Sequence, residues 1–169
     1  MEVKIPSSAQ APGVQEPSLK RLAVVDVPGH FHFRDQLVDS VEVAKAVVVL
    51  VDSKEKEKFG ETAEIIYEII NKVALLDRPV PVVVACNKQD LQFAKKATAV
   101  ESELEREIEE LRKVKRATQQ DEANAKIGYL EDLKKKFSFS DTHLPIQFIE
   151  CSVKSEELTE VYKFINVNF

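Results

Sequence analysis

Residues 82–90 read Val-Val-Val-Ala-Cys-Asn-Lys-Gln-Asp, an apolar run that passes directly into a polar motif. The apolar part has the length and the β-branched composition of a buried strand. Asp90 follows Asn87 by three residues, and a carboxylate held there can accept two parallel hydrogen bonds from the N1–H and 2-amino groups of guanine. Lys88 can lay its aliphatic stem on the base, and Asn87 can tie the loop to its neighbours. The alternative is a surface turn, because an isolated Asn-Lys-x-Asp string carries little information; the preceding strand favours the base-reading loop.

This polar motif is the second of three in chain order, and the third is Cys151-Ser152-Val153-Lys154, which also follows an apolar run. We expect its backbone N–H groups to point at the guanine O6 and Lys154 to cover the edge of the base. The alternative is an ordinary strand-to-helix turn, in which Ser152 or Ser155 only caps the helix.

The first motif in chain order, Asp26-Val27-Pro28-Gly29-His30, ends another apolar run. In nucleotide switches an aspartate in this place holds Mg²⁺ through water, and the following glycine offers its N–H to the γ-phosphate. These are the roles expected of Asp26 and Gly29. His30 stands where a side chain can orient an attacking water; the alternative is a solvated turn residue.

Hydrophobic periodicity predicts alternating strands and helices. The predicted strands are Leu19–Val25, the part of Val41–Val51 after Lys45 (buried on both faces), Val82–Cys86 and Ile146–Cys151, with a possible short strand over Glu2–Ile5. Helices are predicted over 61–76 and 99–116, and a closing helix is expected to be capped by Ser155 and to bury Leu158, Val161, Tyr162 and Ile165. Loops are predicted over Pro6–Ser18 and 117–128. This order predicts an α/β fold with a mostly parallel sheet, whose ligands bind at the carboxyl ends of the strands.

Composition excludes several classes of protein. The chain has 169 residues, 44% hydrophobic and 31% charged, as expected of one soluble globular domain. The net charge of −5 gives no reason to expect direct nucleic-acid binding. Since no apolar run approaches about 20 residues, no membrane segment is predicted in this chain and it is expected to be soluble as it stands. Cys86 and Cys151 are expected to be reduced thiols, because neither has the spacing of a disulfide or metal site.

Together the three motifs resemble the Ras-like GTPase superfamily, and the flanking residues narrow the resemblance to the β subunits of the signal recognition particle receptor. The flanking likeness lies in the Asp-x-Pro-Gly-His form of 26–30 and in segments 51–53, 85–91, 104–107, 137–139 and 144–152. The resemblance covers about residues 19–169. It implies a Ras-like P-loop GTPase fold, with 1–18 as an irregular segment and 19–169 as a partial GTPase-like domain carrying a charged helical insert at about 99–140.

The resemblance also implies a function. Members of the family are small GTPases of the endoplasmic reticulum membrane, on its cytoplasmic face, that use GTP and Mg²⁺ and recruit the receptor's α subunit. Ribosomes carrying nascent chains thereby reach the translocation channel, so the ribosome and the channel are further candidate partners. Matched position by position, the residues are placed in three roles: Asp26 and Gly29 at Mg²⁺ and the γ-phosphate, His30 near the attacking water, and Asn87, Lys88, Asp90, Ser152, Val153 and Lys154 around guanine.

The chain departs from the family at the phosphate loop. No Gly-x-x-x-x-Gly-Lys-Ser/Thr string is present, because none of the four glycines precedes a lysine. The first strand, first helix and first switch of the family pattern are absent with it. We therefore expect GTP to bind very weakly or not at all, and the chain alone to be inactive as a GTPase.

Loss of the first strand also affects the predicted sheet. That strand lies centrally in the Ras-like sheet, between the strands that correspond to 19–25 and 43–51. Either these two strands pair directly, or the chain is a piece of a larger protein, or it is the product of an alternative transcript or incomplete gene model; we favour the last two. Three hypotheses of function follow: a fragment or isoform of a GTP-binding β subunit, a nucleotide-free pseudo-GTPase interaction module, and a different small α/β protein with chance motif matches.

Overall fold

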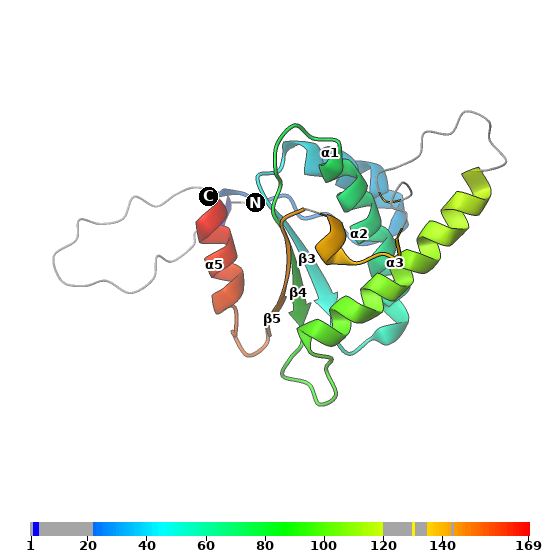
Figure 1. Cartoon of the computed structure of the whole chain (residues 1–169). Helices are drawn as coiled ribbons and strands as arrows, with labels where there is room; N and C mark the ends of the chain where they lie inside the picture. Colours follow the sequence, from blue (N-terminus) through cyan, green and yellow to red (C-terminus); the bar gives the residue numbers. More distant parts are fainter. Residues whose placement is uncertain (1, 4–21, 120–129, 131–134, 143) are drawn as a thin grey trace, which may run out of the picture.

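The computed structural model describes residues 2–3, 22–119, 130, 135–142 and 144–169. Its centre is a parallel sheet of three strands, β3 (Val47–Asp52), β4 (Val82–Asn87) and β5 (Ile146–Glu150), in the order β3-β4-β5 (Figure 1). A separate antiparallel pair joins β1 (Glu2–Val3) to β2 (Leu22–Ala23). The predicted α/β class with a parallel sheet is confirmed. The predicted loop Pro6–Ser18 and most of the connection 117–128 lie outside the described residues.

Helices pack on the sheet and on one another. The α-helices are α1 (Arg34–Val43), α2 (Phe59–Ala74), α3 (Ala97–Gln119) and α5 (Thr159–Asn168), and the short 3-10 helices are η1 (Phe31–Phe33), η2 (Lys56–Lys58) and η3 (Phe139–Thr142). Helix α2 contacts both α1 and α3, and α5 contacts β5. In the described part of the chain every helix is too short or too polar to cross a lipid bilayer.

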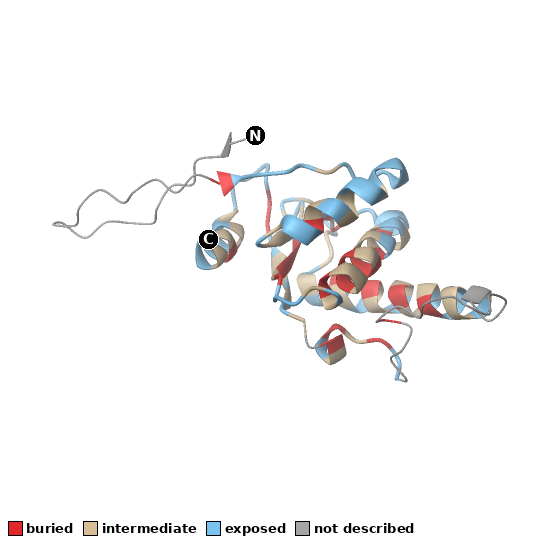
Figure 2. Ribbon diagram, turned by 90° about the horizontal axis from the view of Figure 1, so that it is seen from above, coloured by how far each residue is buried: buried red, intermediate tan, exposed pale blue. Residues whose placement is uncertain are grey.

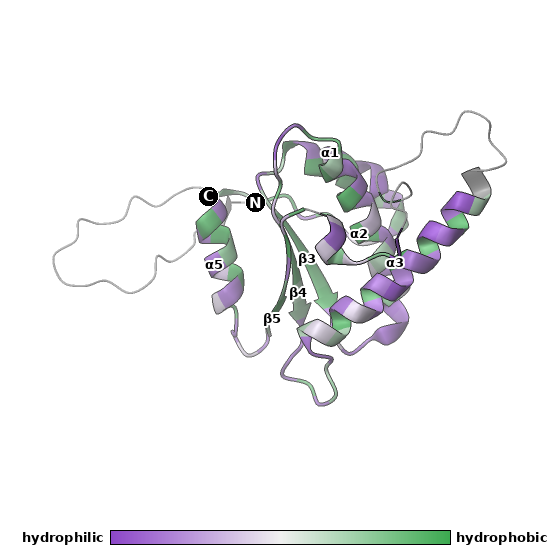
Figure 3. Ribbon diagram, viewed as in Figure 1, coloured by the Kyte–Doolittle hydropathy of each residue, from purple (hydrophilic) through white to green (hydrophobic). Residues whose placement is uncertain are grey.

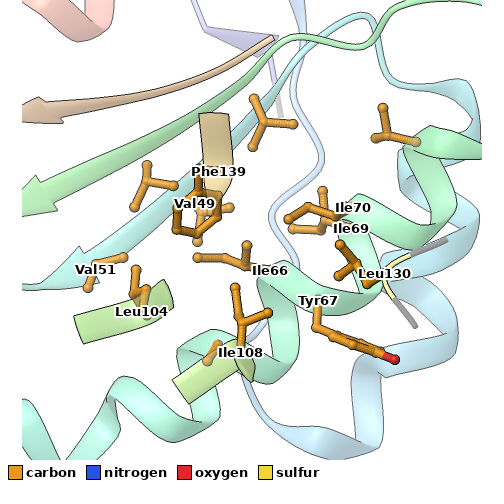
Figure 4. Packing of buried hydrophobic residues seen from close by; sticks show 14 of the residues in the cluster. Val49, Val51, Ile66, Tyr67, Ile69, Ile70, Leu104, Ile108, Leu130 and Phe139 are labelled. Carbon is orange, nitrogen blue, oxygen red and sulfur yellow. The ribbon is translucent and has the colours of Figure 1, made fainter. Parts of the chain in front are cut away.

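The core lies between the sheet and helices α2 and α3. Val49 and Val51 of β3 pack there with Ile66, Ile70 and Leu104 (Figure 4). Figure 2 shows the buried residues of α2 and α3 facing the interior, and Figure 3 shows the apolar strands beside a largely hydrophilic α3. The helices predicted over 61–76 and 99–116 are therefore present as α2 and α3, and the buried residues at helical spacing share one face of each.

The strand predicted in Val41–Val51 begins after Lys45 as expected, but its predicted burial on both faces is wrong. Residues up to Val43 belong to α1, and β3 begins at Val47. Val48 and Leu50 are 43% and 60% exposed, because no described strand pairs with the outer side of β3.

The predicted strand Leu19–Val25 is also shorter than expected. Of its described residues only Leu22 and Ala23 are in β2, while Val24 and Val25 are exposed. The structure has two separate sheets, so β2 does not pair directly with β3. Direct pairing was one of the three alternatives, and it is not the arrangement found.

The predicted cap of the closing helix is wrong. The last helix, α5, begins at Thr159, and the Ser155 N–H donates to Ser152 Oγ at 3.2 Å instead. Glu156 has a φ of 57°, in the left-handed region, so the backbone cannot continue as a helix from Ser155. Of the four residues expected to be buried, Tyr162 is exposed and the others are half-buried; the buried residue of α5 is Phe164.

Candidate functional site

The second and third motifs meet at the carboxyl edge of the parallel sheet. They follow β4 and β5, which are neighbouring strands. The Cys151 N–H donates to Cys86 O at 3.0 Å, and the Gln89 N–H donates to Cys151 O at 3.2 Å. Parallel strands end at the same edge, so the two loops lie against each other, as expected for a site at this edge.

Two side-chain hydrogen bonds join the loops further. Asn87 Oδ1 accepts from the Val153 N–H at 3.0 Å, and Ser152 Oγ donates to Asp90 Oδ1 at 2.6 Å. Ser152 is fully buried, and the Asp90 side chain is 15% exposed. Asn87 thus ties the loop to its neighbour in the manner predicted. Ser152 fixes the orientation of the Asp90 carboxylate, whose other oxygen, Oδ2, lies 3.9 Å from Lys154 Nζ.

Lys88 is held by a residue that sequence reasoning missed. Its Nζ lies 2.5 Å from Asp52 Oδ2, and its φ of 67° is left-handed. This hydrogen bond raises the pKa of Lys88. Partial burial acts to raise the pKa of Asp52, but hydrogen bonds from the Lys88 side chain and the Lys54 N–H outweigh it and lower that pKa. The available signal was the place of Asp52 at the end of β3, in register with Asn87.

The backbone donors of the third motif are mostly used inside the protein. The Ser152 N–H donates to Glu157 O at 3.2 Å, and the Val153 N–H is taken by Asn87. Among the described residues, the Lys154 N–H has no hydrogen-bond partner. That backbone N–H groups of this motif face the guanine O6 stays a prediction. Since the Ser152 and Val153 N–H groups are already hydrogen-bonded, the prediction now concerns the Lys154 N–H. The Lys154 side chain is 82% exposed, with Nζ 3.9 Å from Asp90 Oδ2.

Gln89 and Glu150 stabilise the loops around the site through hydrogen bonds, and sequence reasoning missed both residues. Gln89 Nε2 donates to Lys95 O at 2.8 Å, which draws the loop after β4 together. Glu150 accepts from the Ala97 N–H and from Lys96 Nζ, both at 3.0 Å, at the start of α3. Both hydrogen bonds lower the pKa of Glu150, and the one from the Ala97 N–H contributes the most. Their sequence signal is weak, because Gln89 and Glu150 reach partners that only folding brings close.

The first motif lies apart from these hydrogen bonds. His30 caps η1, its Nδ1 accepting from the His32 N–H at 3.4 Å, and the two imidazole rings stack at 4.8 Å. A Cβ on Gly29 would lie 3.5 Å from Ile65 Cδ1, so the motif runs along α2. Asp26 is exposed and, within the described part of the chain, its carboxylate has no hydrogen-bond or ion-pair partner. Among the described residues no hydrogen bond links this motif to the base-reading loops.

Comparison with known proteins resolves the identity of the fold. Residues 5–146 match the family described as signal recognition particle receptor beta subunit. This chain belongs to the signal recognition particle receptor beta subunit family. The mouse protein of that name is 36% identical over 138 residues, which are 79% of this chain and 51% of the mouse protein. The human protein is 33% identical over the same span. The chain thus covers about half the length of these relatives.

Solved structures agree with the family. The mammalian SRP receptor structure is 32% identical, with a TM-score of 0.68 over 84% of this chain and 71% of that one. The SRb-GDP-Mg structure from Chaetomium thermophilum has a TM-score of 0.69 over 86% of this chain and 79% of that one. It is 20% identical and shows the fold alone. The predicted Ras-like fold and the resemblance to receptor β subunits are confirmed.

The residues of this beta-subunit family member fit guanine better than they fit Mg²⁺. Asp90 is a partly buried carboxylate oriented by a buried hydroxyl, as recognition of the guanine edge requires. Asp26 is an isolated, exposed carboxylate, and the described residues contain no group of three or more Cys, His, Asp or Glu side chains that could hold a metal. Mg²⁺ takes near-octahedral oxygen coordination. We therefore derive no step through a metal ion.

Proposed function

We propose that this chain acts as a beta subunit of the signal recognition particle receptor, in co-translational targeting of ribosome–nascent chain complexes to the cytoplasmic face of the endoplasmic reticulum membrane. Its partner is the receptor's α subunit, and its ligand is a guanine nucleotide that it recognises by the base. Family membership supports the role. Support for the ligand class comes from solved relatives named as SRb-GDP-Mg and as an SRb-GTP/SRX complex.

One observation carries the proposed ligand: the loops after β4 and β5 are joined by the Ser152–Asp90 and Asn87–Val153 hydrogen bonds. Asp90 accepts from guanine N1–H and the 2-amino group. Adenine offers neither donor, so it leaves the carboxylate unpaired, which costs about 1–3 kcal/mol or more. The ion pair with Asp52 holds Lys88, whose stem covers the base.

Nucleotide binding by this chain is impaired. The printed sequence has no glycine-rich phosphate loop, so the backbone N–H groups that cradle the phosphates in such proteins are not supplied. Asp26, Gly29 and His30 keep the residue types of the γ-phosphate, metal and water positions, but within the described part of the chain they make no hydrogen bond to the base-reading loops. We expect very weak GTP binding and no hydrolysis.

Calorimetry and a specificity change test this proposal. Titration of the chain with GTP and Mg²⁺ is expected to give no binding at micromolar concentration; micromolar or tighter affinity would contradict impaired binding. NMR titration with millimolar guanosine and xanthosine is expected to show a guanosine preference that Asp90→Asn shifts toward xanthosine. Asp77→Asn, at an exposed position outside the site, is the matched control. An unchanged preference in Asp90→Asn would refute the assignment of Asp90.

A second candidate function is a nucleotide-free pseudo-GTPase interaction module. It is favoured by the exposed aromatic cluster in η1, just after the first motif, where Phe31 is 64% exposed and its ring lies 3.9 Å from that of His32. Exposed aromatic groups mark protein interaction sites. Capture of the α subunit's N-terminal domain without nucleotide, lost in Phe31→Ser and kept in the exposed control Leu75→Ser, would support this module. Capture that requires GTP would exclude it.

A further inference from the structure

Residues 135–139 lie against α3 as an extended chain. Burial alternates along them: Phe137 and Phe139 are 2% and 5% exposed, whereas Ser138 between them is half-buried. A period of two is that of extended backbone, and Ser138 belongs to no helix or strand. The two rings pack edge to face at 5.0 Å in the core, so the segment buries its phenylalanines and leaves Ser138 at the rim.

Glu105 of α3 holds this segment in place. Its Oε1 accepts from the Ser138 hydroxyl at 2.7 Å and from the Phe139 N–H at 2.9 Å. Glu101 lies one turn away on the same helix, and burial first, then the charge of Glu105, raises the pKa of Glu101. The surroundings of the Ser138 hydroxyl are therefore already acidic, and a further negative charge placed there has a carboxylate as its neighbour.

The residues before Ser138 carry a charge pattern that serine kinases recognise. Lys135 and Lys136 stand three and two residues before it, and both are exposed. Within the described part of the chain neither lysine forms an ion pair. Kinases that select basic substrates bind such residues through acidic groups beside the active site, because opposite charges fix the register of the bound chain.

The other hydroxyl side chains near basic residues are placed differently. Two basic residues stand at the same spacing before Thr98 and Thr118, but both threonines belong to α3, so the helix must unwind before a kinase can bind them in extended form. Ser140 is exposed, but it lies in η3 and follows the nearer lysine by four residues. Ser138 is the serine that combines extended backbone with this spacing.

We propose that Ser138 is a phosphorylation site for a serine kinase that selects basic substrates, and that phosphorylation releases residues 137–139 from α3. In the transfer, the Ser138 oxygen bonds to the γ-phosphorus of ATP, the bond from that phosphorus to the bridging oxygen of ADP breaks, and the hydroxyl proton passes to a base of the kinase. The product replaces a hydroxyl donor with a group that carries about 1.5–2 negative charges at pH 7. It loses the 2.7 Å hydrogen bond and repels the carboxylate that also holds the Phe139 N–H.

Release of the segment uncovers part of the core. Phe139 packs edge to face on Phe148 of β5 at 4.9 Å as well as on Phe137. Once Glu105 no longer holds the backbone between these rings, the segment opens locally at a lower free energy than the central strands. Among the described residues, Ser138 makes no hydrogen bond to the base-reading loops, so this modification is independent of the proposed nucleotide site.

Phosphorylation of the folded 169-residue chain tests the site. The probe is the catalytic subunit of the cyclic AMP-dependent protein kinase with ATP and Mg²⁺, followed by mass spectrometry of the peptides. We expect phosphate on Ser138, no phosphate at this position in Ser138→Ala, and a rate at Ser138 about tenfold lower when Lys135 and Lys136 are both changed to alanine. Lys163→Ala removes a 65% exposed lysine of α5 and is expected to react like the parent.

Hydrogen exchange of the phosphorylated chain tests the release. The Phe139 N–H is expected to exchange about tenfold faster after phosphorylation, whereas the N–H of Val84 in the central strand keeps its rate. In Glu105→Gln the phosphate meets no like charge at this position, so we expect phosphorylation to accelerate the Phe139 exchange less than in the parent. Circular dichroism melts confirm that each variant is folded.

Three results would overturn the proposal. They are a folded chain that takes up no phosphate, phosphate confined to residues other than Ser138, and a chain phosphorylated on Ser138 whose Phe139 N–H exchanges at the rate of the unmodified chain.

Discussion

The hydrogen bond from Ser152 to Asp90 provides the most direct test of the site. Ser152→Ala removes a fully buried hydroxyl donor, 2.6 Å from a carboxylate oxygen, from the loop after β5. A hydrogen bond to a charged group contributes about 1.5–3 kcal/mol to stability. The Asp90 side chain is 15% exposed, so water replaces part of this, and we expect a loss of about 1–2 kcal/mol. For a domain of this size that lowers Tm by about 3–6 °C.

Urea denaturation of a double-mutant cycle measures the pair itself. The cycle combines Ser152→Ala with Asp90→Asn, and we expect a coupling free energy of about 1 kcal/mol. Ser102→Ala is the matched control, because Ser102 is exposed and donates only to Thr98 O of its own helix, at 3.0 Å. It is expected to change stability by no more than about 0.5 kcal/mol. A coupling below about 0.3 kcal/mol would show that Ser152 does not orient Asp90.

Three further predictions concern stability and reactivity. The hydrogen bond from Lys95 lowers the pKa of Glu103. The ionised Glu103 therefore stabilises the fold fully above its unfolded pKa of about 4.5, and this stabilisation is lost as pH falls through its folded pKa. In urea denaturation the parent should exceed Glu103→Gln in stability by about 1 kcal/mol or less at neutral pH, and this difference should vanish at acid pH. Burial raises the pKa of Cys86 to about 12, so a thiol reagent at pH 8, followed by mass spectrometry, should label Cys86 only after unfolding. Arg112→Met leaves the Glu109 carboxylate without its 2.6 Å ion-pair partner and Leu130 O without its 2.8 Å donor. Because Arg112 is fully buried, this should cost about 3–5 kcal/mol in thermal or urea unfolding.

Much of the central fold was predictable because its signals are local. The run Val82–Cys86 is apolar throughout, and β4 is buried on both faces as its composition predicts. The isoleucines of α2 recur at helical spacing, and the helix forms where that period begins and ends. The end of α1 at Val43 was not predictable, since valine is compatible with both helix and strand and tertiary packing decides between them.

The residues of the candidate site likewise divide into those that local sequence signals and those that only folding brings together. Asn87, Lys88, Asp90 and the 152–154 segment were identifiable from residue type and position after strands. Their partners Asp52 and Glu150 were not, because each lies far away in sequence and meets the site only when β3, β4 and β5 align. The Mg²⁺ role of Asp26, the water-orienting role of His30 and the division into 1–18 and 19–169 stay predictions.

From residue order and type alone, the family, the α/β class and the two base-reading motifs follow, because each rests on a short run of neighbours. The folded chain adds what no short run contains: which N–H groups of the third motif are already used, what holds Lys88, and which side chains of β3 are exposed. The exposure of Val48 and Leu50 is the clearest case. A valine-rich strand reads as buried on both faces, yet burial depends on whether a neighbouring strand and helix are present, and that is a property of the packed structure.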